Sequence, residues 1–227
     1  MESLRPQHLS FLSSPGHRPA LLVVDVQRSF GDPAFLTPYG LDEHASALVE
    51  AAITETSRLV EAAREAGVPV VWIELASDPE NPWRSSAWFR GGDLDAPPGP
   101  DEPCVIGTRG AEWYRVAPAE GEPRVAKRHY SGFLGTDLET RLRAEGIDWV
   151  AVAGLTTECC VTATATDAFQ LGWPVVVPVD AVAAYDTRLH NNALEQLALN
   201  VAVLSTAADL AALWKDREAA NDLEILR

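Results

Sequence analysis

Short apolar runs that alternate with amphipathic stretches are the feature of this sequence that most constrains its fold. The runs over residues 20–26 and 68–73 are separated by an amphipathic stretch over residues 43–66, which Gly67 ends. Continuous apolar runs of this length are typical of strands buried on both faces of a parallel sheet. The order strand, helix, strand predicts a right-handed crossover between two parallel strands.

The same alternation returns in the second half of the chain. The expected strands span residues 123–127, 149–153, 173–177 and 200–204. The expected helices span residues 136–145, 158–171, 187–198 and 206–215. Together with the first two strands, this order predicts an α/β fold, a three-layer αβα sandwich around a six-stranded, mostly parallel sheet.

Residues 76–122 interrupt the alternation with a long segment rich in Pro, Gly, Trp and acidic residues. A segment of this length without regular structure is uncommon in a compact domain unless it has a function. We expect an irregular excursion over the sheet edge with a short helix near residues 110–116, serving either as a packed surface or as a pocket wall or subunit contact. The expected organisation is an N-terminal extension over 1–17, one domain over 18–216 that includes the excursion, and a C-terminal tail over 217–227.

Composition argues against several classes of function. The chain has 18 Lys and Arg against 33 Asp and Glu, a formal charge of −15, which argues against binding to nucleic acid or to an anionic membrane. Three cysteines are too few for a disulfide scaffold. The first eighteen residues lack the apolar core of a signal peptide. We therefore expect a cytoplasmic protein.

Three reactive side chains follow predicted strands: Asp25, Lys127 and Cys160. Ligand sites of open parallel sheets lie beyond the carboxyl ends of the strands. Singly, Asp25 has an alternative interpretation as a turn cap, Lys127 as a solvent-exposed residue and Cys160 as a buried, inert thiol. Together they can form a nucleophilic site in which Cys160 attacks, Asp25 shuttles protons, and Lys127 stabilises the thiolate and orients Asp25.

The segment around Cys160 is predicted to start a helix. Gly154 permits a tight turn and Thr157 is a natural N-cap, which places Cys160 at the third helical position. The positive end of the helix there would lower the pKa of the thiol, and free N–H groups could stabilise an oxyanion. Cys159 lies about 100° away around the helix, so we interpret it as a packing residue. Cys104 has no assigned role.

Signatures of cofactors and metals are missing from the sequence. It contains no G-x-G-x-x-G after the first strand, no P-loop and no G-x-S-x-G elbow. Its five histidines form neither H-x-H nor H-E-x-x-H. We predict neither a cofactor nor a metal.

Three segments resemble the isochorismatase-like cysteine hydrolase family. LLVVDVQRSF resembles the opening strand with the catalytic Asp, VAKRHYSGFLGTDLETRLRAEGID the segment with the Lys, and GLTTECCVTATATDAFQLG the block with the nucleophilic Cys. The resemblance covers roughly residues 18–206. It implies a Rossmann-like sandwich, an Asp25–Lys127–Cys160 triad, and a homo-oligomer, either a dimer or a tetramer. It also implies a cis peptide between Leu155 and Thr156 that turns the N–H groups of Thr156 and Cys160 into an oxyanion hole.

Within the family, the substrate is indicated by two further stretches. Residues 107–112, GTRGAE, resemble the G-T-W-G-A-E of members that act on ureido and N-carbamoyl compounds, with Arg109 in place of Trp. Nicotinamidases carry an Asp-x-His metal motif after the second strand, whereas residues 74–79 contain no histidine. The nicotinamidase interpretation is weakened accordingly.

The sequence therefore predicts a cysteine hydrolase that cleaves the C–N bond of a small linear amide, a ureido or N-carbamoyl compound, through a covalent acyl-Cys intermediate. The alternatives are a vinyl-ether hydrolase of the isochorismatase type that uses the Asp as an acid, a nicotinamidase-like amidase, and a non-catalytic or redox-sensing protein. The candidate substrate-binding residues are Gln27, Phe30, Tyr130, Phe133 and Arg109.

Overall fold

A parallel sheet with strand order β3-β2-β1-β4-β5-β7 runs through the centre of the molecule. The computed structural model describes residues 5–94, 99 and 102–225. The strands are β1 (Pro19–Val24), β2 (Val70–Leu75), β3 (Arg124–Lys127), β4 (Trp149–Leu155), β5 (Val175–Pro178), β6 (Val182–Ala183) and β7 (Ala202–Ser205). The helices are α1 (Pro6–Leu12), α2 (Arg28–Gly31), α3 (Pro33–Leu36), α4 (Glu43–Glu65), α5 (Arg84–Phe89), α6 (Leu138–Ala144), α7 (Thr162–Gln170), α8 (Thr187–Asn200) and α9 (Ala207–Ile225).

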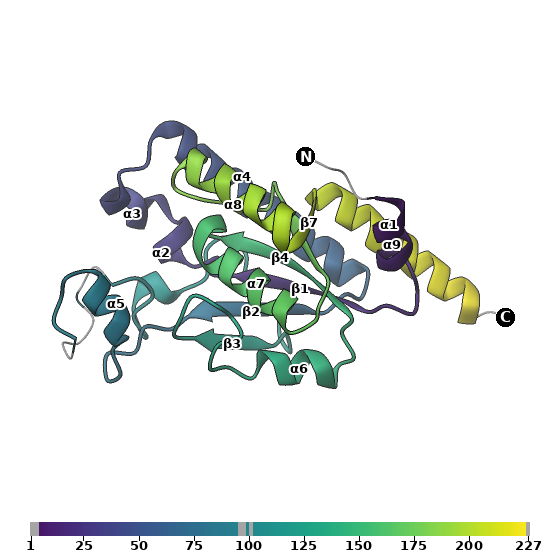
Figure 1. The fold of residues 1–227 in the computed structure, drawn as a ribbon, viewed down its shortest axis with the longest axis horizontal. Coiled ribbons are helices and arrows are strands. Elements are labelled where there is room, and N and C mark those ends of the chain that lie inside the picture. The colour runs from purple at the N-terminus through teal and green to yellow at the C-terminus, as the bar shows by residue number, and fades with distance from the viewer. Residues whose placement is uncertain (1–4, 95–98, 100–101, 226–227) are drawn as a thin grey trace.

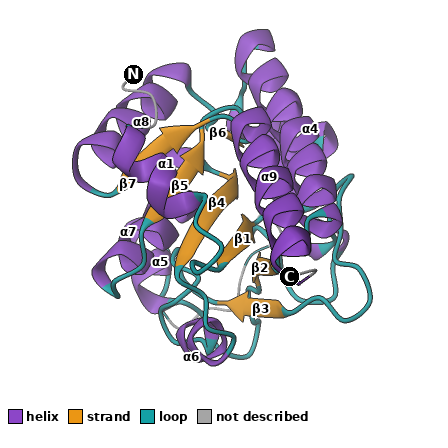
Figure 2. Cartoon of the chain, turned by 90° about the vertical axis from the view of Figure 1, so that its right-hand side faces the viewer, coloured by secondary structure: helices purple, strands orange, loops and turns teal. Residues whose placement is uncertain are grey.

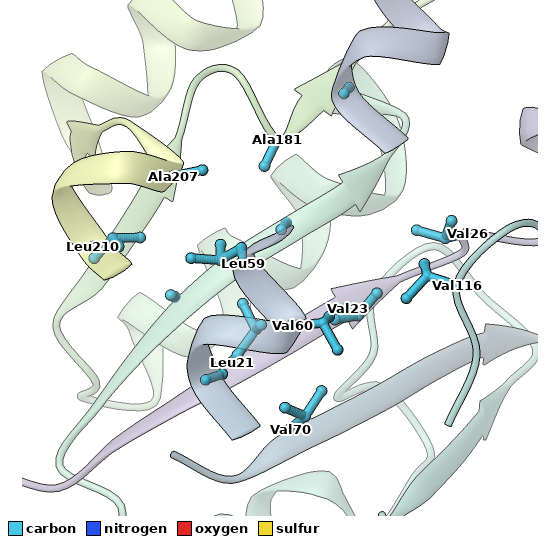
Figure 3. Packing of buried hydrophobic residues seen from close by; sticks show 14 of the residues in the cluster. Leu21, Val23, Val26, Leu59, Val60, Val70, Val116, Ala181, Ala207 and Leu210 are labelled. Carbon is cyan, nitrogen blue, oxygen red and sulfur yellow. The ribbon is translucent and has the colours of Figure 1, made fainter. Parts of the chain in front are cut away.

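Helices cover both faces of the sheet, which confirms the predicted three-layer architecture (Figures 1 and 2). Helices α4 and α9 lie on one face, and α6, α7 and α8 on the other. Successive residues of β1 point to opposite faces, so Leu21 and Val23 meet α4 (Figure 3) while Leu22 packs on the other side. The burial of β1 on both faces explains its continuous apolar run.

Helix α4 shows how local signals set the length of an element. The Asp42 side chain caps its start by accepting the Ala45 N–H at 2.7 Å. Buried residues recur along one face, among them Val49, Ile53 and Val60. The helix ends before Gly67, so it agrees closely with the predicted span of residues 43–66.

The sheet contains seven strands, not the six that the sequence predicted, because β6 pairs with β4 separately from β5. Strand β5 pairs with Val150 and Ala151 of β4, and the chain then turns away after Pro178. It returns as the two residues of β6, which pair with Gly154 and Leu155 at the end of β4. Two residues are too few to produce a recognisable period in the sequence.

The excursion and the two ends of the domain also differ in detail from the predictions. A short 3₁₀ helix, η2, spans Arg109–Ala111 in place of the expected helix near 110–116, and α5 was not predicted. The last helix extends to Ile225 instead of ending near residue 215, and so crosses the predicted boundary of the tail. Helix α1 lies within the predicted N-terminal extension and buries Leu12 in the core. The domain boundaries themselves stay predictions.

We find no helix in the described part of the chain with the length and apolar character needed to cross a membrane.

Candidate active site

The strand order reverses between β1 and β4. The candidate residues lie at the carboxyl ends of the strands close to this point. Strands β1, β2 and β3 follow one another in one direction, whereas β4, β5 and β7 follow in the other. Asp25 comes directly after β1, Lys127 ends β3, and Cys160 follows β4. A reversal of this kind opens a crevice at the carboxyl ends of the strands, where ligands of α/β proteins bind.

The structure brings Asp25, Lys127 and Cys160 into direct contact. Lys127 Nζ lies 2.8 Å from Asp25 Oδ2 and donates a hydrogen bond to Cys160 Sγ at 3.4 Å. Asp25 and Lys127 are fully buried, and Cys160 is 6% exposed. These side chains come from three strand ends spread over 135 residues of sequence, so the sheet itself assembles the group.

The backbone at Asp25 has an unusual conformation. Its φ of 51° lies in the left-handed region, which is uncommon for a residue other than glycine. The Asp25 N–H donates to the Ile73 carbonyl at 2.8 Å, which continues the contact with β2 just beyond the end of β1. A strained residue of this kind is often found at a functional site.

Burial and charge act in opposite directions on the Asp25–Lys127 pair. Burial raises the pKa of Asp25 above its ordinary value, and the Lys127 charge only partly offsets it. Burial also opposes the charge on Lys127, but Asp25 and Cys160 outweigh it, so the pKa of Lys127 is raised. Lys127 therefore stays an ammonium ion, and the raised pKa makes the Asp25 carboxylate a stronger base than an exposed aspartate.

The turn that carries Cys160 differs from the predicted helix start. The peptide bond between Leu155 and Thr156 is cis. Residues Thr157–Val161 then form a π-type turn, η3, in which the Val161 N–H donates to the Thr156 carbonyl at 3.2 Å. Thr156, and not Thr157, occupies the cap position, and the prediction of a Thr157 N-cap was wrong. The Thr157 hydroxyl is instead engaged by a side chain of α8.

That side chain is His190, which sequence reasoning did not connect with the site. Its Nδ1 lies 2.9 Å from Thr157 Oγ1. Burial lowers the pKa of His190, so its imidazole stays neutral and can accept the Thr157 hydroxyl hydrogen. Only the packing of α8 against η3 brings the two residues together, and no motif joins them in the sequence.

The two neighbouring cysteines have different environments. Cys159 is partly exposed, and its Sγ lies 4.0 Å from that of the buried Cys160. This contact, burial and the charge of Asp25 raise the pKa of the Cys160 thiol well above its usual range, although Lys127 opposes them. The expectation of a lowered Cys160 pKa was therefore wrong, because burial and contacts dominate. The contact with Cys160 lowers the pKa of Cys159.

Gln27 lies behind the site and is fully engaged with the main chain. Its Oε1 accepts the Leu75 N–H at 2.9 Å, and its Nε2 donates to the carbonyls of Leu75 and Ala111, each at 3.0 Å. This buried side chain therefore fixes the end of β2 to the excursion. Residues 27 and 113 also form an antiparallel bridge.

The two candidate phenylalanines pack into the two cores. Phe30 packs against the α4 side of the sheet, and its carbonyl accepts the Tyr185 hydroxyl at 3.0 Å. Phe133 belongs to the same cluster as Cys160 on the opposite face, and its ring centroid lies 5.8 Å from that of Trp173. Phe133 therefore shares a packing cluster with Cys160, whereas Phe30 packs on the opposite face of the sheet.

Tyr130 and Arg109 are both exposed, but their surroundings differ. Tyr130 follows Lys127 by three residues, and its ring centroid lies 4.8 Å from that of Trp83 in the excursion. Arg109 lies on η2, with its side chain toward solvent. The structure thus places Tyr130 beside the excursion next to the site and leaves Arg109 at the surface.

The side chains after β2 are occupied by protein contacts, in the region where nicotinamidases carry the metal motif. Glu74 accepts two hydrogen bonds from Arg124, at 2.9 and 2.8 Å. The Ser77 hydroxyl donates to the Pro103 carbonyl at 2.7 Å, and Asp78 Oδ1 accepts the Glu80 N–H at 2.9 Å. Among the described residues, no group of three or more His, Cys, Asp or Glu side chains is arranged to hold a metal ion.

A family model described as the isochorismatase domain matches residues 19–209. The chain belongs to the isochorismatase family. This confirms the resemblance that the three motifs indicated, and it places Asp25, Lys127 and Cys160 inside the matched region.

Relatives in this family include amidohydrolases. A ureidoacrylate amidohydrolase of Methylobacterium radiotolerans is 32% identical over 189 residues, covering 78% of this chain and 72% of that protein. A maleamate amidohydrolase of Pseudomonas putida is 32% identical over 168 residues, covering 74% and 73%. The crystal structure of an N-carbamoylsarcosine amidase from Thermoplasma acidophilum is similar, with a TM-score of 0.65 and 28% identity over 84% of this chain and 96% of that one.

Proposed function

We propose that this isochorismatase-family protein is a cysteine hydrolase that cleaves the C–N bond of a small linear amide, a ureido or N-carbamoyl compound, through an acyl-Cys intermediate. The observation that carries the proposal is the contact of Lys127 Nζ with both Asp25 Oδ2, at 2.8 Å, and Cys160 Sγ, at 3.4 Å. A buried base, a cation and a thiol in one group provide an activated nucleophile.

The first step is removal of the Cys160 proton. Because the thiol pKa is raised, the resting site holds Cys160 as a thiol. Asp25 takes the proton when the substrate carbonyl arrives, and the Lys127 ammonium stabilises the thiolate that forms. The sulfur then attacks the carbonyl carbon, an S–C bond forms, and the carbonyl electron pair moves to oxygen.

The second step breaks the amide. The N–H groups of Thr156 and Cys160 receive the oxyanion, in a role comparable to that of other oxyanion holes. The tetrahedral intermediate collapses, the C–N bond breaks, and Asp25 returns its proton to the leaving ammonia or amine. Asp25 next takes a proton from water, whose oxygen bonds to the acyl carbon. The S–C bond then breaks, and Cys160 regains a proton.

The names of the relatives support an amide substrate. They include hydrolases named for ureidoacrylate, maleamate and N-carbamoylsarcosine. The GTRGAE stretch points to the same class of compounds. Its Gly110 packs against Ser29, which lies shortly after the end of β1.

An ammonia-release screen tests the proposal. It covers ureido acids, dicarboxylic monoamides, biuret, nicotinamide and simple amides, each with the wild type and Cys160→Ala. We expect turnover of at least one linear amide by the wild type and none by the variant, which should keep its fold. A separate assay follows the products of a vinyl ether by chromatography. Hydrolysis of that compound that survives Cys160→Ala but not Asp25→Ala would contradict the amide mechanism. A modifiable thiol without turnover of any compound would indicate a redox-sensing protein.

We further propose that the protein acts in the cytoplasm as a homo-oligomer. The described cysteines Cys104, Cys159 and Cys160 are free thiols, which supports a reducing compartment. Light scattering after size-exclusion chromatography measures the oligomeric state, for which we expect a dimer or a tetramer.

A further inference from the structure

His190, on helix α8, is joined to the turn that carries the candidate nucleophile by one side-chain contact. Its Nδ1 lies 2.9 Å from Oγ1 of Thr157, a residue with no exposed surface. Thr157 begins η3, and Cys160 lies three residues further along the same turn. The two contacting residues are 33 positions apart in the sequence, so the contact fixes η3 to a separate helix.

The surroundings of the Thr157 hydroxyl decide which of the two groups donates. A buried hydroxyl hydrogen needs an acceptor. In the part of the chain that the structure describes, His190 Nδ1 is the one atom that is hydrogen-bonded to this hydroxyl. If Nδ1 carried a hydrogen, the hydroxyl hydrogen would have no partner. The Thr157 hydroxyl therefore donates, Nδ1 accepts, and the proton of the neutral imidazole lies on Nε2.

The other contacts of η3 are mostly local. The N–H groups of Cys159 and Val161 both donate to the Thr156 carbonyl at 3.2 Å. Among the described residues, two side chains distant in sequence form hydrogen bonds with the turn. Lys127 contacts the Cys160 sulfur, and His190 contacts Thr157. His190 is thus the distant side chain that fixes the beginning of the turn, whereas Lys127 contacts the reacting atom.

Protonation of His190 would remove this contact, because Nδ1 can no longer accept once it carries a hydrogen. The ring is partly exposed, so a proton can reach it from solvent. Burial lowers the pKa of His190, so the neutral form persists to a pH below the ordinary value of about 6.5. The titratable groups on the elements packed against it are Asp186, Arg188 and Glu195 on α8 and its cap, Glu158, Cys159 and Cys160 on η3, and Asp167 on α7.

We propose that His190 is a positioning residue for the reaction at Cys160. By accepting the Thr157 hydroxyl hydrogen, its Nδ1 holds the beginning of η3 in place, and with it the N–H groups of Thr156 and Cys160 that receive the oxyanion. These groups stabilise the transition state only if they already point at the oxyanion, so a small shift of the turn lowers the rate. The inference rests on the proposed amide hydrolysis, and His190 acts on the reaction through Thr157.

Two substitutions of His190 test the role of its acceptor. His190→Leu removes the acceptor, and we expect kcat for a linear amide to fall at least about tenfold while KM stays within about threefold. His190→Asn places a carbonyl oxygen as many bonds from Cα as Nδ1 is, so it should restore kcat to within about threefold of the wild type at neutral pH. Equal losses in both variants, or no loss in either, overturn the proposal. Melting temperatures show whether each variant is folded.

The pH profile separates positioning from a merely structural role. The amide of His190→Asn does not titrate, whereas Asp25 titrates in both proteins and cancels from their ratio. The ratio of kcat/KM for the variant to that for the wild type should rise as the pH falls, to about tenfold at one unit below the His190 pKa. His17→Asn is the matched control, because His17 is also partly exposed but precedes β1 at the opposite edge of the sheet. A constant ratio for His190→Asn, or the same rise for His17→Asn, contradicts the proposal.

A double-variant cycle tests whether His190 acts through Thr157. Thr157→Val removes the hydroxyl and keeps the shape of the side chain. If the two residues act as one unit, Thr157→Val combined with His190→Leu should lose no more activity than the more damaging single variant, to within about threefold. Losses that multiply would show that His190 acts by another route.

Hydrogen exchange separates this proposal from the proposed function, because it needs no substrate. Mass spectrometry follows the peptide that contains the Cys159 and Val161 amides at about pH 7.5 and about pH 5, corrected for intrinsic exchange. Protection should fall about tenfold at the lower pH in the wild type, stay constant in His190→Asn, and be low at both values in His190→Leu. This pattern supports the positioning role even if no amide is cleaved. Equal protection in all three proteins overturns it even if amide hydrolysis is confirmed.

Discussion

Lys127 Nζ lies 2.8 Å from Asp25 Oδ2, and neither side chain has any exposed surface. The pair joins the end of β3 to the end of β1 across β2, and it places a cation beside the candidate nucleophile. Removing one partner of a buried ion pair destabilises the fold far more than replacing both partners with apolar residues, because the remaining charge stays buried without a partner. The pair therefore links the stability of the fold to the chemistry of the site.

Asp25→Asn keeps the shape of the side chain but removes the base. We expect kcat to fall by about 10²- to 10⁴-fold, as is typical when a general base is lost. Lys127 is left without its buried partner, so the free energy of unfolding should decrease by about 3–5 kcal/mol. Rate assays and urea denaturation measure the two effects. The double variant Asp25→Asn/Lys127→Met should regain stability but not activity, and recovery of activity would contradict the assigned roles.

The two cysteines should be alkylated at different rates, Cys159 before Cys160. Cys159 is the more exposed and has a lowered pKa, whereas burial and its contacts raise the pKa of Cys160. Since the thiolate is the reactive form, iodoacetamide should modify Cys159 first at neutral pH. Modification of Cys160 should increase as the pH rises. Peptide mass spectrometry over a pH series shows the order, and preferential labelling of Cys160 at neutral pH would contradict it.

Activity distinguishes the same two residues. Cys159→Ser should keep most of the activity because Cys159 lies outside the Asp25–Lys127 contact, while Cys160→Ser should lose at least about 10²-fold. The two substitutions are chemically identical and adjacent, so each controls for the other. Comparable losses in both variants would show that the nucleophile has been assigned wrongly.

Gly154 is required by the close approach of β1 and β4. Its φ is 115°, and a Cβ added there would lie 2.0 Å from the Val24 carbonyl oxygen. Gly154→Ala should therefore destabilise the fold by more than about 3 kcal/mol or prevent folding. Gly67→Ala is the matched control, because Gly67 also has a positive φ, of 64°, but no atom within 4 Å of the added Cβ. Its cost should be about 1 kcal/mol in urea denaturation.

Glu122 attaches the end of the excursion to the sheet. Its carboxylate should make the stability of the fold depend on pH in the acidic range. Its hydrogen bonds with Arg64, at 2.8 and 2.9 Å, and with Trp72 Nε1, at 2.6 Å, hold the pKa of Glu122 below its ordinary value. A lowered pKa in the folded state contributes stability above the unfolded value of about 4.3, and this contribution is lost as the pH falls through the folded value.

Glu122→Gln tests this sign. The variant should be less stable than the wild type by about 1–2 kcal/mol at pH 7. The difference should shrink as the pH falls below about 4, because the wild-type carboxyl is then protonated. Urea denaturation at several pH values measures it, and a difference that stays constant down to acidic pH would contradict the role of the Glu122 charge.

Much of the fold could be predicted because the elements with clear periods formed where expected. Strand β1 and helix α4 carry strong local patterns, and both agree closely with the predictions. Strand β6 and helix α5 are short and lack a period, so the sequence did not reveal them. The pKa of Cys160 could not be predicted either, since it depends on how deeply the residues around it are packed.

The sequence by itself determined the three layers and the family and singled out the three candidate residues, because each depends on local pattern or on a short motif. Only the tertiary structure decided what surrounds them. It engages the Gln27 amide with the main chain and pairs Thr157 with His190. These contacts join segments far apart in the chain, and no local property of either partner encodes them, so they exist only once the sheet has brought the segments together.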